Sequence, residues 1–274
     1  MCYGSPTAPY GPFGQGQTGA GAHGWWWADS VKKASNGRLI ITWAEPGAIF
    51  PIGEADNAVS RGVVQIASSF GTYYAGRMPE ADVETGGVFQ WENNEQAYEC
   101  VTKYGSMRAL QQVYAKRNMM WLPFFGNAII GMGANFSAPN PAAIKGKKMR
   151  AIGNWADYIR MLGGSPIATV WGDIYMAMKM GTIDGYVAGP GTFEELKLKE
   201  VTKSYVYPPL ISAGLSNFTI NMDAWKALPA DLQELLERDT PAITYAGLSH
   251  FSGLRFFGFQ QFEIEQSHFL NNIP

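Results

Sequence analysis

The chain of 274 residues is long enough for one large domain or two of ordinary size, and 46% hydrophobic with 16% charged residues is typical of a folded globular protein. The formal net charge of −2, with basic residues scattered along the chain, argues against a nucleic-acid-binding surface. No apolar run approaches the roughly 18–20 residues that a membrane-spanning helix needs.

The first 24 residues are rich in Gly, Pro, Ser and Thr, which predicts an irregular or extended lead-in. They lack the charged start and the apolar centre of a secretory signal. If the protein is exported, we therefore expect its signal peptide to be absent from this sequence.

Helix and strand patterns alternate in the first half of the chain, which predicts βα units on a mainly parallel sheet. The predicted elements are, in chain order, a helix at 25–35, a strand at 38–43, a short helix at 54–60 and a strand at 63–67. Gly37 and Gly62 end the two helices, because glycine adopts the left-handed conformation of a helix C-terminus without a Cβ clash. Residues 68–76 follow as a loop, at the end of a strand where open α/β sheets bind ligands.

The middle of the chain predicts helices at 93–104 and 106–116 and an apolar strand at 121–125. Residues 126–141 are rich in Gly, Asn, Ser, Ala and Pro, which suggests a crossing between two domains. The elements expected next are a strand at 148–153, a helix capped by Asn154 and running to 162, a strand at 166–170, a helix at 173–180 and a strand at 182–188. A long helical pattern then covers 229–270; Pro229 suits its start, whereas Pro241 must bend or break it.

Familiar catalytic patterns are absent from the sequence. It contains no GxSxG, no P-loop and no GxGxxG between a strand and a helix. Adjacent carboxylates such as Glu194 and Glu195 are typical of a solvated helix surface. The three His residues lie far apart, and Cys2 and Cys100 lack metal-site spacing, so they form either a disulfide or two free thiols. We predict no catalytic residue, no metal site and no cofactor.

Arg150 is the residue that most suggests a ligand site. It lies in an apolar strand that leads directly into the helix beginning at Asn154. A guanidinium at the ligand-binding edge of a sheet offers a planar set of donors that matches a carboxylate and stays protonated. Two structural explanations remain open: an ion pair with an internal Asp or Glu, or exposure to solvent.

Trp171 and Tyr175 follow the next predicted strand, at the same expected edge of the sheet. Aromatic side chains there can enclose an organic ligand, and a role in the core is equally compatible with the pattern.

Several motifs follow one another in a fixed order. In residues 144–189, a KGxKxR strand is followed by a helix ending in Leu-Gly-Gly, a Trp before a helix with Tyr175, and a GxxDG turn. Together with segments 35–39, 76–80, 200–203 and 225–231, this region resembles the DctP-type substrate-binding proteins of TRAP transporters, the tripartite ATP-independent periplasmic transporters. The resemblance covers about residues 22 to 262, and the order and spacing of these motifs make it specific.

The resemblance implies a two-lobed α/β fold of the periplasmic-binding-protein type (class II), with mixed sheets flanked by helices and a long helix that spans both lobes. The implied lobes are 1–125 with 212–245, and 126–211 with 246–274. It also implies a periplasmic protein that closes on its ligand and delivers it to the membrane subunits of a TRAP transporter. No nucleic acid is expected as a partner.

Arg150 matches the family arginine that forms a salt bridge with the substrate carboxylate. Trp171 and Tyr175 match positions that line the cleft, as does the loop with Phe70, Thr72 and Tyr73. Two positions depart from the pattern. Ala188 lies in the segment 186–189, where some members carry Asn or Glu-Trp, and Asn127 is the polar candidate in a region where some members have a second Arg. These departures predict a more apolar ligand.

The leading hypothesis is therefore a receptor, and not an enzyme, for a small organic carboxylate. Trp155 adds to the aromatic residues that suggest a flat or apolar ligand body, such as an aromatic or keto acid, and Asn154 is a further candidate ligand contact. An α/β enzyme or sensor domain that reuses the fold is the first alternative. An interaction protein with a vestigial cleft is the second.

Overall fold

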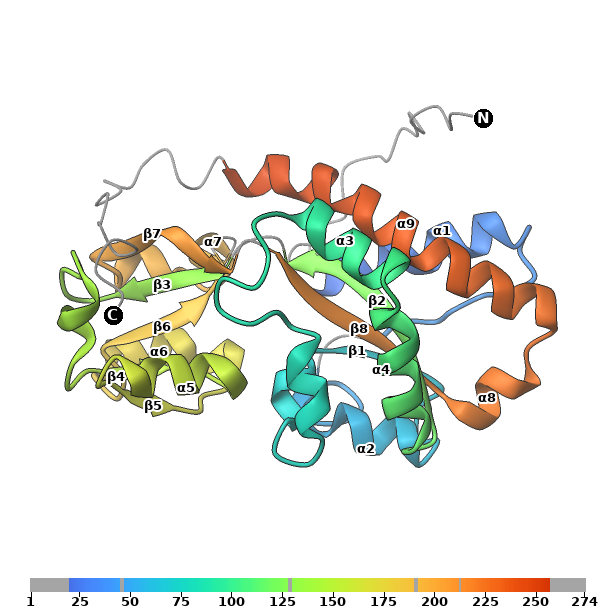
Figure 1. Ribbon diagram of the computed structural model, residues 1–274, viewed down its shortest axis with the longest axis horizontal. Helices are drawn as coiled ribbons and strands as arrows, with labels where there is room; N and C mark the ends of the chain where they lie inside the picture. The colour runs from blue at the N-terminus through green and yellow to red at the C-terminus, as the bar shows by residue number, and fades with distance from the viewer. Residues whose placement is uncertain (1–19, 45–46, 128–129, 190–191, 212, 257–274) are drawn as a thin grey trace.

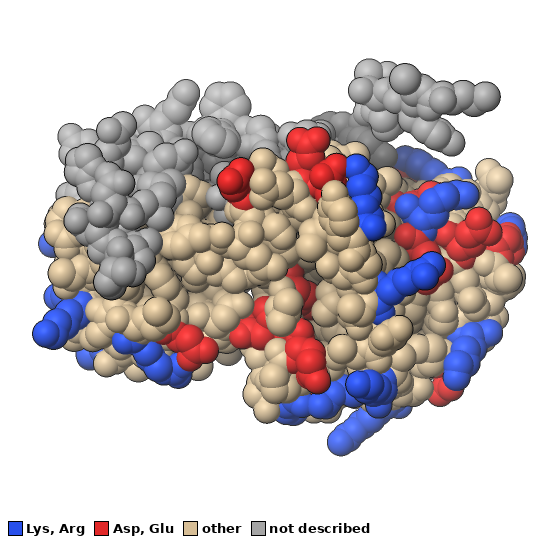
Figure 2. All heavy atoms as spheres, viewed as in Figure 1, with Lys and Arg blue, Asp and Glu red and all other residues tan. Residues whose placement is uncertain are grey.

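The computed structural model describes residues 20–44, 47–127, 130–189, 192–211 and 213–256, which form two lobes, each built on its own sheet (Figure 1). The first lobe has a three-stranded sheet of order β1-β8-β2, and the second has a five-stranded sheet of order β5-β4-β6-β3-β7. We call them the three-stranded lobe and the five-stranded lobe. In Figure 2 the surface is indented between them, and on the face shown the basic side chains are interspersed with acidic ones.

The three-stranded lobe is formed from β1 (Ile66–Ser69), β2 (Met119–Asn127) and β8 (Gly214–Asn221). Its helices are α1 (Ala20–Ala34), α2 (Ala55–Ser60), α3 (Asn94–Lys103), α4 (Ser106–Ala115), α8 (Met222–Ala227) and α9 (Ala230–Phe256). Both faces of β2 are buried: Trp121 packs beside Tyr114 of α4, and Leu122 packs with Trp27 of α1. This explains why β2 is apolar from Met119 to Phe125.

The expectation of a mainly parallel sheet in the first half of the chain is wrong. β8 lies between β1 and β2 and pairs antiparallel with both, with Ser68 opposite Phe218 and Leu122 opposite Phe218 on the other side. A strand from residue 214 onward therefore separates two strands that the sequence order would place together. Local patterns do not carry the identity of such a distant partner.

The five-stranded lobe contains β3 (Ile130–Ala134), β4 (Lys148–Arg150), β5 (Ser165–Ile167), β6 (Gly185–Ala188) and β7 (Ser204–Ile211). Its helices are α5 (Gly153–Met161), α6 (Ile174–Lys179) and α7 (Thr192–Glu195). β4 pairs parallel with β5 and β6, whereas β3 pairs antiparallel with β6 and β7. The crossovers β4-α5-β5 and β5-α6-β6 run in opposite directions across the sheet, so right-handed connections place α5 and α6 on opposite faces.

Side-chain alternation in β6 agrees with this arrangement. Val187 packs in the cluster that contains Trp155 and Ile159 of α5. Its neighbour Tyr186 packs on the other face, with Ile174 of α6. The observed mixed sheets flanked by helices confirm the predicted fold class.

The segment 126–141, which we expected to cross between two domains, contains the end of β2 in one lobe and the buried strand β3 of the other. Two of its glycines lie against aromatic rings. A Cβ on Gly133 would lie 2.3 Å from Cζ of Tyr186, and a Cβ on Gly131 would lie 2.7 Å from the hydroxyl of Tyr205. Gly131 and Gly133 are therefore needed to admit two tyrosine rings.

Some other predicted elements form with shifted ends, and one does not form. The helix predicted at 93–104 is confirmed as α3; its N-cap is Asn93, whose side chain accepts a hydrogen bond from the amide of Gln96. No strand forms at 38–43, although Leu39, Ile41 and Trp43 alternate toward the core and Ile40 is 66% exposed. The predicted strand at 63–67 begins only at Ile66.

The long C-terminal helix is confirmed as α9, which follows Pro229 and includes Pro241. It runs along the three-stranded lobe, and its C-terminal end reaches toward the other lobe (Figure 1). The part of the prediction beyond 256 lies outside the described residues. Within the described part of the chain, no helix has the length and apolar character needed to cross a membrane.

Candidate functional site

Arg150 is the last residue of β4 and is only 2% exposed. Its Nε donates to the carbonyl of Thr169 at 3.0 Å, and its Nη1 donates to the carbonyl of Val187 at 3.0 Å. Nη2 lies 3.5 Å from the hydroxyl of Tyr73, which belongs to the other lobe. Three of the five guanidinium N–H donors are thus assigned, and the other two have no acceptor among the described residues.

The guanidinium of Arg150 is a buried cation. Among the residues that the structure describes, no Asp or Glu forms an ion pair with it, and the side chain is not exposed to solvent. Within this part of the chain, the two structural explanations that the sequence left open therefore do not hold. Burial lowers the pKa of Arg150, and the nearby Tyr73 raises it. Because a buried charge without a counterion is unfavourable, the site is complementary to an anion.

Tyr73 is positioned by a short segment after β1. Phe70 follows the last residue of that strand, and residues Gly71–Tyr74 form the 3₁₀ turn η2. The rings of Phe70 and Tyr73 meet edge to face at 6.3 Å. Thr72 is buried in the same turn, so the loop predicted from the sequence reaches Arg150 through Tyr73.

Asn154 and Trp155 lie at the start of α5, where the two lobes meet. Asn154 does not cap the helix as expected; the N-cap residue is Ile152, and Asn154 lies in the first turn. Its side-chain Nδ2 donates to the carbonyl of Asp82 at 3.2 Å, and Nε1 of Trp155 donates to the carbonyl of Gly86 at 3.4 Å. Both side chains therefore join the five-stranded lobe to the segment 82–86.

Three buried polar atoms in this region have no hydrogen-bond partner among the described residues: Oγ1 of Thr72, Oδ1 of Asp82 and Oδ1 of Asn154. Burial raises the pKa of the Asp82 carboxyl, whereas a hydrogen bond from the backbone of Asn154 lowers it. Buried groups of this kind are normally satisfied by water or a ligand. The junction of the lobes is therefore polar as well as aromatic.

None of the remaining predicted site residues has a side-chain hydrogen bond to Arg150 in the described part of the chain. Trp171 is half-buried in the cluster with α6. The hydroxyl of Tyr175 donates to Glu200 at 2.6 Å, and no hydrogen bond or ring contact of the described residues joins it to Arg150. Ala188 is buried at the end of β6, next to Val187, and its carbonyl accepts from Tyr205 at 2.9 Å. Asn127 pairs with Gly214 at the end of β2, and its side chain lies outside the described part.

Sequence reasoning missed the groups that hold Arg150 in place. The carbonyls of Thr169 and Val187 leave no side-chain signature, so no residue pattern could have identified them. Asp82 was also missed, because an acidic residue in a polar loop is ordinarily solvent-exposed.

In the described part of the chain, no group of three or more His, Cys, Asp or Glu residues could hold a metal ion. Cys100 is a free thiol beside Ser106, and Cys2 lies outside the described residues.

Comparison with known proteins identifies the family of the chain. The model of the DctP family, bacterial extracellular solute-binding protein family 7, matches residues 19–249. The chain belongs to this family. Its similarity to a monocarboxylate 2-oxoacid-binding periplasmic protein of a Nostoc species is 29% identity over 83% of the chain and 63% of that protein. The chain thus spans less than two thirds of that curated relative.

Solved structures show that this family member has the fold of TRAP solute-binding proteins. One, from Bordetella bronchiseptica with copurified calcium and picolinate, superposes with a TM-score of 0.80, at 24% identity over 88% of this chain and 72% of that one. Another, from Colwellia psychrerythraea with bound calcium and pyruvate, gives a TM-score of 0.77, at 23% identity over 90% and 76%. The two-lobed fold expected from the sequence is confirmed.

Proposed function

We propose that this family member is an extracytoplasmic receptor that binds a small organic carboxylate between its lobes and delivers it, unchanged, to the membrane subunits of a TRAP transporter. The observation that carries the proposal is Arg150, a buried guanidinium with two free donors and no acidic partner among the described residues. A bound carboxylate would supply the missing negative charge in a planar, two-bonded contact.

Two further features support a ligand between the lobes. Tyr73 of one lobe approaches Arg150 of the other, so a ligand on Arg150 would touch both. The three unpartnered polar atoms near Gly153 can serve a second polar group on the ligand, such as a keto oxygen bridged by water.

We propose lobe boundaries at 1–125 with 212–245 and at 126–211 with 246–274, and a periplasmic location.

The ligand class we propose is an aromatic or keto monocarboxylate. The relative from Nostoc is a 2-oxoacid-binding protein, and the two solved neighbours hold picolinate and pyruvate. Phe70 and Tyr73, in edge-to-face contact, offer ring surface beside Arg150. Trp171, Tyr175, Asn127, Trp155 and Ala188 complete the proposed lining.

The test replaces Arg150 by Lys, which keeps the charge but loses the planar pair of donors, and by Met. Calorimetric titration with pyruvate and picolinate should show binding to the wild type and a loss of at least about 100-fold in both variants, because the buried carboxylate would lose its partner. Arg160→Met, on the exposed part of α5, is the matched control.

Unchanged affinity in the Arg150 variants would contradict this site. Mass spectrometry of wild-type protein with each acid then separates receptor from enzyme, because a receptor returns its ligand intact and an enzyme consumes it. Recovery of a chemically altered acid would contradict a pure binding role.

A further inference from the structure

Glu84 is a buried carboxylate inside the three-stranded lobe, and only 1% of it is exposed. Four donors from four parts of the chain converge on it. Oε1 accepts from the backbone N–H of Gly71 at 2.8 Å and from the side-chain amide of Asn217 on β8. Oε2 accepts from the hydroxyl of Tyr114 on α4 at 2.8 Å and from Nε1 of Trp121 on β2 at 2.5 Å. Glu84 therefore ties the core of this lobe to the first residue of η2.

Gly71 is pressed closely against this carboxylate. A Cβ on Gly71 would lie 2.0 Å from the carbonyl of Ala81 and 2.6 Å from Oε1 of Glu84. The next two residues are Thr72 and Tyr73, and the Tyr73 hydroxyl lies 3.5 Å from Nη2 of Arg150. The turn that approaches Arg150 thus begins at a backbone group held by Glu84.

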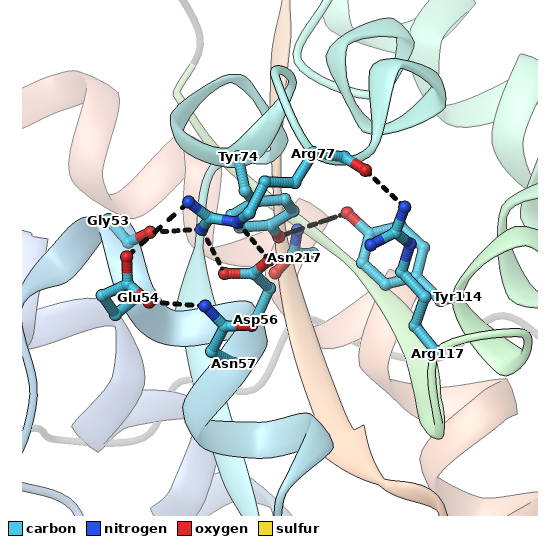
Figure 3. Close-up of polar contacts among 9 residues, drawn as sticks. All are labelled: Gly53, Glu54, Asp56, Asn57, Tyr74, Arg77, Tyr114, Arg117 and Asn217. Atoms are coloured by element: carbon cyan, nitrogen blue, oxygen red, sulfur yellow. Dashed lines mark hydrogen bonds and ion pairs between the residues drawn. The ribbon is translucent and has the colours of Figure 1, made fainter.

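The other end of the turn is held by an ion pair (Figure 3). Arg77 donates through Nε and Nη2 to both carboxylate oxygens of Asp56, at 3.1 and 2.6 Å, and Nη2 also donates to the carbonyl of Gly53 at 2.7 Å. Between the two anchors, Tyr74 points into the lobe, where its hydroxyl lies 2.8 Å from the amide of Asn217 and 3.2 Å from Tyr114. Tyr73, in contrast, reaches the junction of the lobes.

We infer that Glu84 is a positioning residue for the carboxylate site, acting through Gly71 on the turn that carries Thr72 and Tyr73. It does not touch the ligand. By accepting a hydrogen bond from the Gly71 N–H, it holds the turn in the position that brings the Tyr73 hydroxyl close to Arg150. This inference rests on the proposed function only for its effect on affinity, since its effect on the turn is independent of any ligand.

The test compares Glu84→Leu, which keeps most of the side-chain volume but removes the acceptors, with Glu84→Gln, whose single amide oxygen can still accept from Gly71. Hydrogen exchange of the backbone amides in residues 69–74 reports the turn, and titration with pyruvate and picolinate reports the site. In Glu84→Leu we expect amide exchange to rise about tenfold or more and affinity to fall by a similar factor. Glu84→Gln should restore both to within about threefold of the wild type.

Trp121→Phe is the matched control, because it removes a donor to the same carboxylate, and among the described residues Trp121 has no hydrogen bond to the turn. It should lower the melting temperature and leave exchange of the turn and affinity nearly unchanged. An equal loss of affinity in Trp121→Phe and Glu84→Leu would overturn the inference, since it would indicate a general loss of stability. Unchanged exchange and affinity in Glu84→Leu would overturn it as well.

If Glu84→Leu does not fold, Gly71→Ala displaces the turn from the same contact and should give the same two effects. Unchanged exchange and affinity in that variant would equally overturn the inference. The proposed function fails separately, if the wild type binds neither acid; amide exchange then still decides the role of Glu84. Conversely, loss of binding in Arg150→Lys with no effect of Glu84→Leu removes only this inference.

Discussion

Arg150 and Glu84 are both buried ionisable side chains, and burial acts on them in opposite directions. It lowers the pKa of Arg150, which nevertheless titrates so far above neutrality that the guanidinium stays charged. It raises the pKa of Glu84 to about 7, although the hydrogen bonds from Tyr114, Asn217, Trp121 and Gly71 oppose this shift. The site therefore has a permanent cation, whereas its supporting carboxylate changes charge near neutral pH.

The titration of Glu84 predicts a pH dependence of stability. Its carboxyl binds a proton more tightly in the folded state, with a pKa of about 7, than in the unfolded chain, where the ordinary pKa is 4.5. The resulting stabilisation is complete below pH 4.5 and is lost as the pH rises through about 7, and it amounts to at most about 3 kcal/mol. Burial raises the pKa values of the neighbouring Tyr74 and Tyr114 phenols well above 10, so both stay protonated in this range.

Denaturant unfolding of the wild type and of Glu84→Gln at pH 5 to 8 checks this prediction. The free energy of unfolding of the wild type should fall relative to the variant across this range, because only the wild type loses the proton. A difference between the two proteins that does not change with pH would show that Glu84 keeps one charge state throughout.

At the scale of single elements, β3 illustrates how tertiary packing sets residue choice. Five consecutive residues of this strand are buried, and its two glycines leave room for the rings of Tyr186 and Tyr205 from the neighbouring strands β6 and β7. The Tyr186 hydroxyl lies 2.9 Å from that of Thr202, and the Tyr205 hydroxyl donates to the carbonyl of Ala188. Both rings are thus held in place and cannot easily yield to a larger neighbour.

Gly133→Ala tests this packing. The added methyl group would overlap the Tyr186 ring, and we expect a loss of about 1–3 kcal/mol in the free energy of unfolding. Gly172→Ala is the control in the same lobe, since a Cβ there meets no atom within 4 Å. Equal stability of the two variants in thermal or denaturant unfolding would contradict the packing argument.

At the scale of the whole molecule, the lobes meet where α5 begins. Gly153 has a left-handed backbone with φ of +54°, and a Cβ on it would lie 2.2 Å from Oδ1 of Asp82 and 2.8 Å from Cγ2 of Thr72. Phe89 adds an edge-to-face contact with Tyr158 of α5. Close approach of the two lobes thus depends on the absence of a side chain at residue 153.

Gly153→Ala should therefore push the lobes apart as well as strain the backbone. We expect a larger radius of gyration in small-angle scattering and an affinity for pyruvate or picolinate at least about tenfold lower. Gly146→Ala separates the two effects, because Gly146 also has a positive φ, +74°, but no atom lies within 4 Å of its Cβ position. If both variants scatter and bind alike, residue 153 has no special part in bringing the lobes together.

Local sequence patterns were enough to determine most helices, the apolar strand β2, the two-lobed fold class through the ordered motifs around residues 144–189, and the choice of Arg150 as the central candidate. These properties depend on local patterns along the chain, such as the helical pattern at 93–104 or a charged residue in an apolar strand. Arg150 could be chosen as a candidate from the sequence because a charged side chain is uncommon in an apolar strand.

Only the tertiary structure decided which groups surround that arginine and hold its neighbours. Tyr73 is 77 residues from Arg150 in sequence, and Asn217 is 133 residues from Glu84. Two other features also depend on residues far apart in the sequence: β8 lies between β1 and β2, and the rings of Tyr186 and Tyr205 pack against β3. Contacts over such separations arise from chain topology and leave no periodic signal. The sequence therefore singled out Arg150, whereas the fold determined which groups contact it and which groups hold Tyr73 near it.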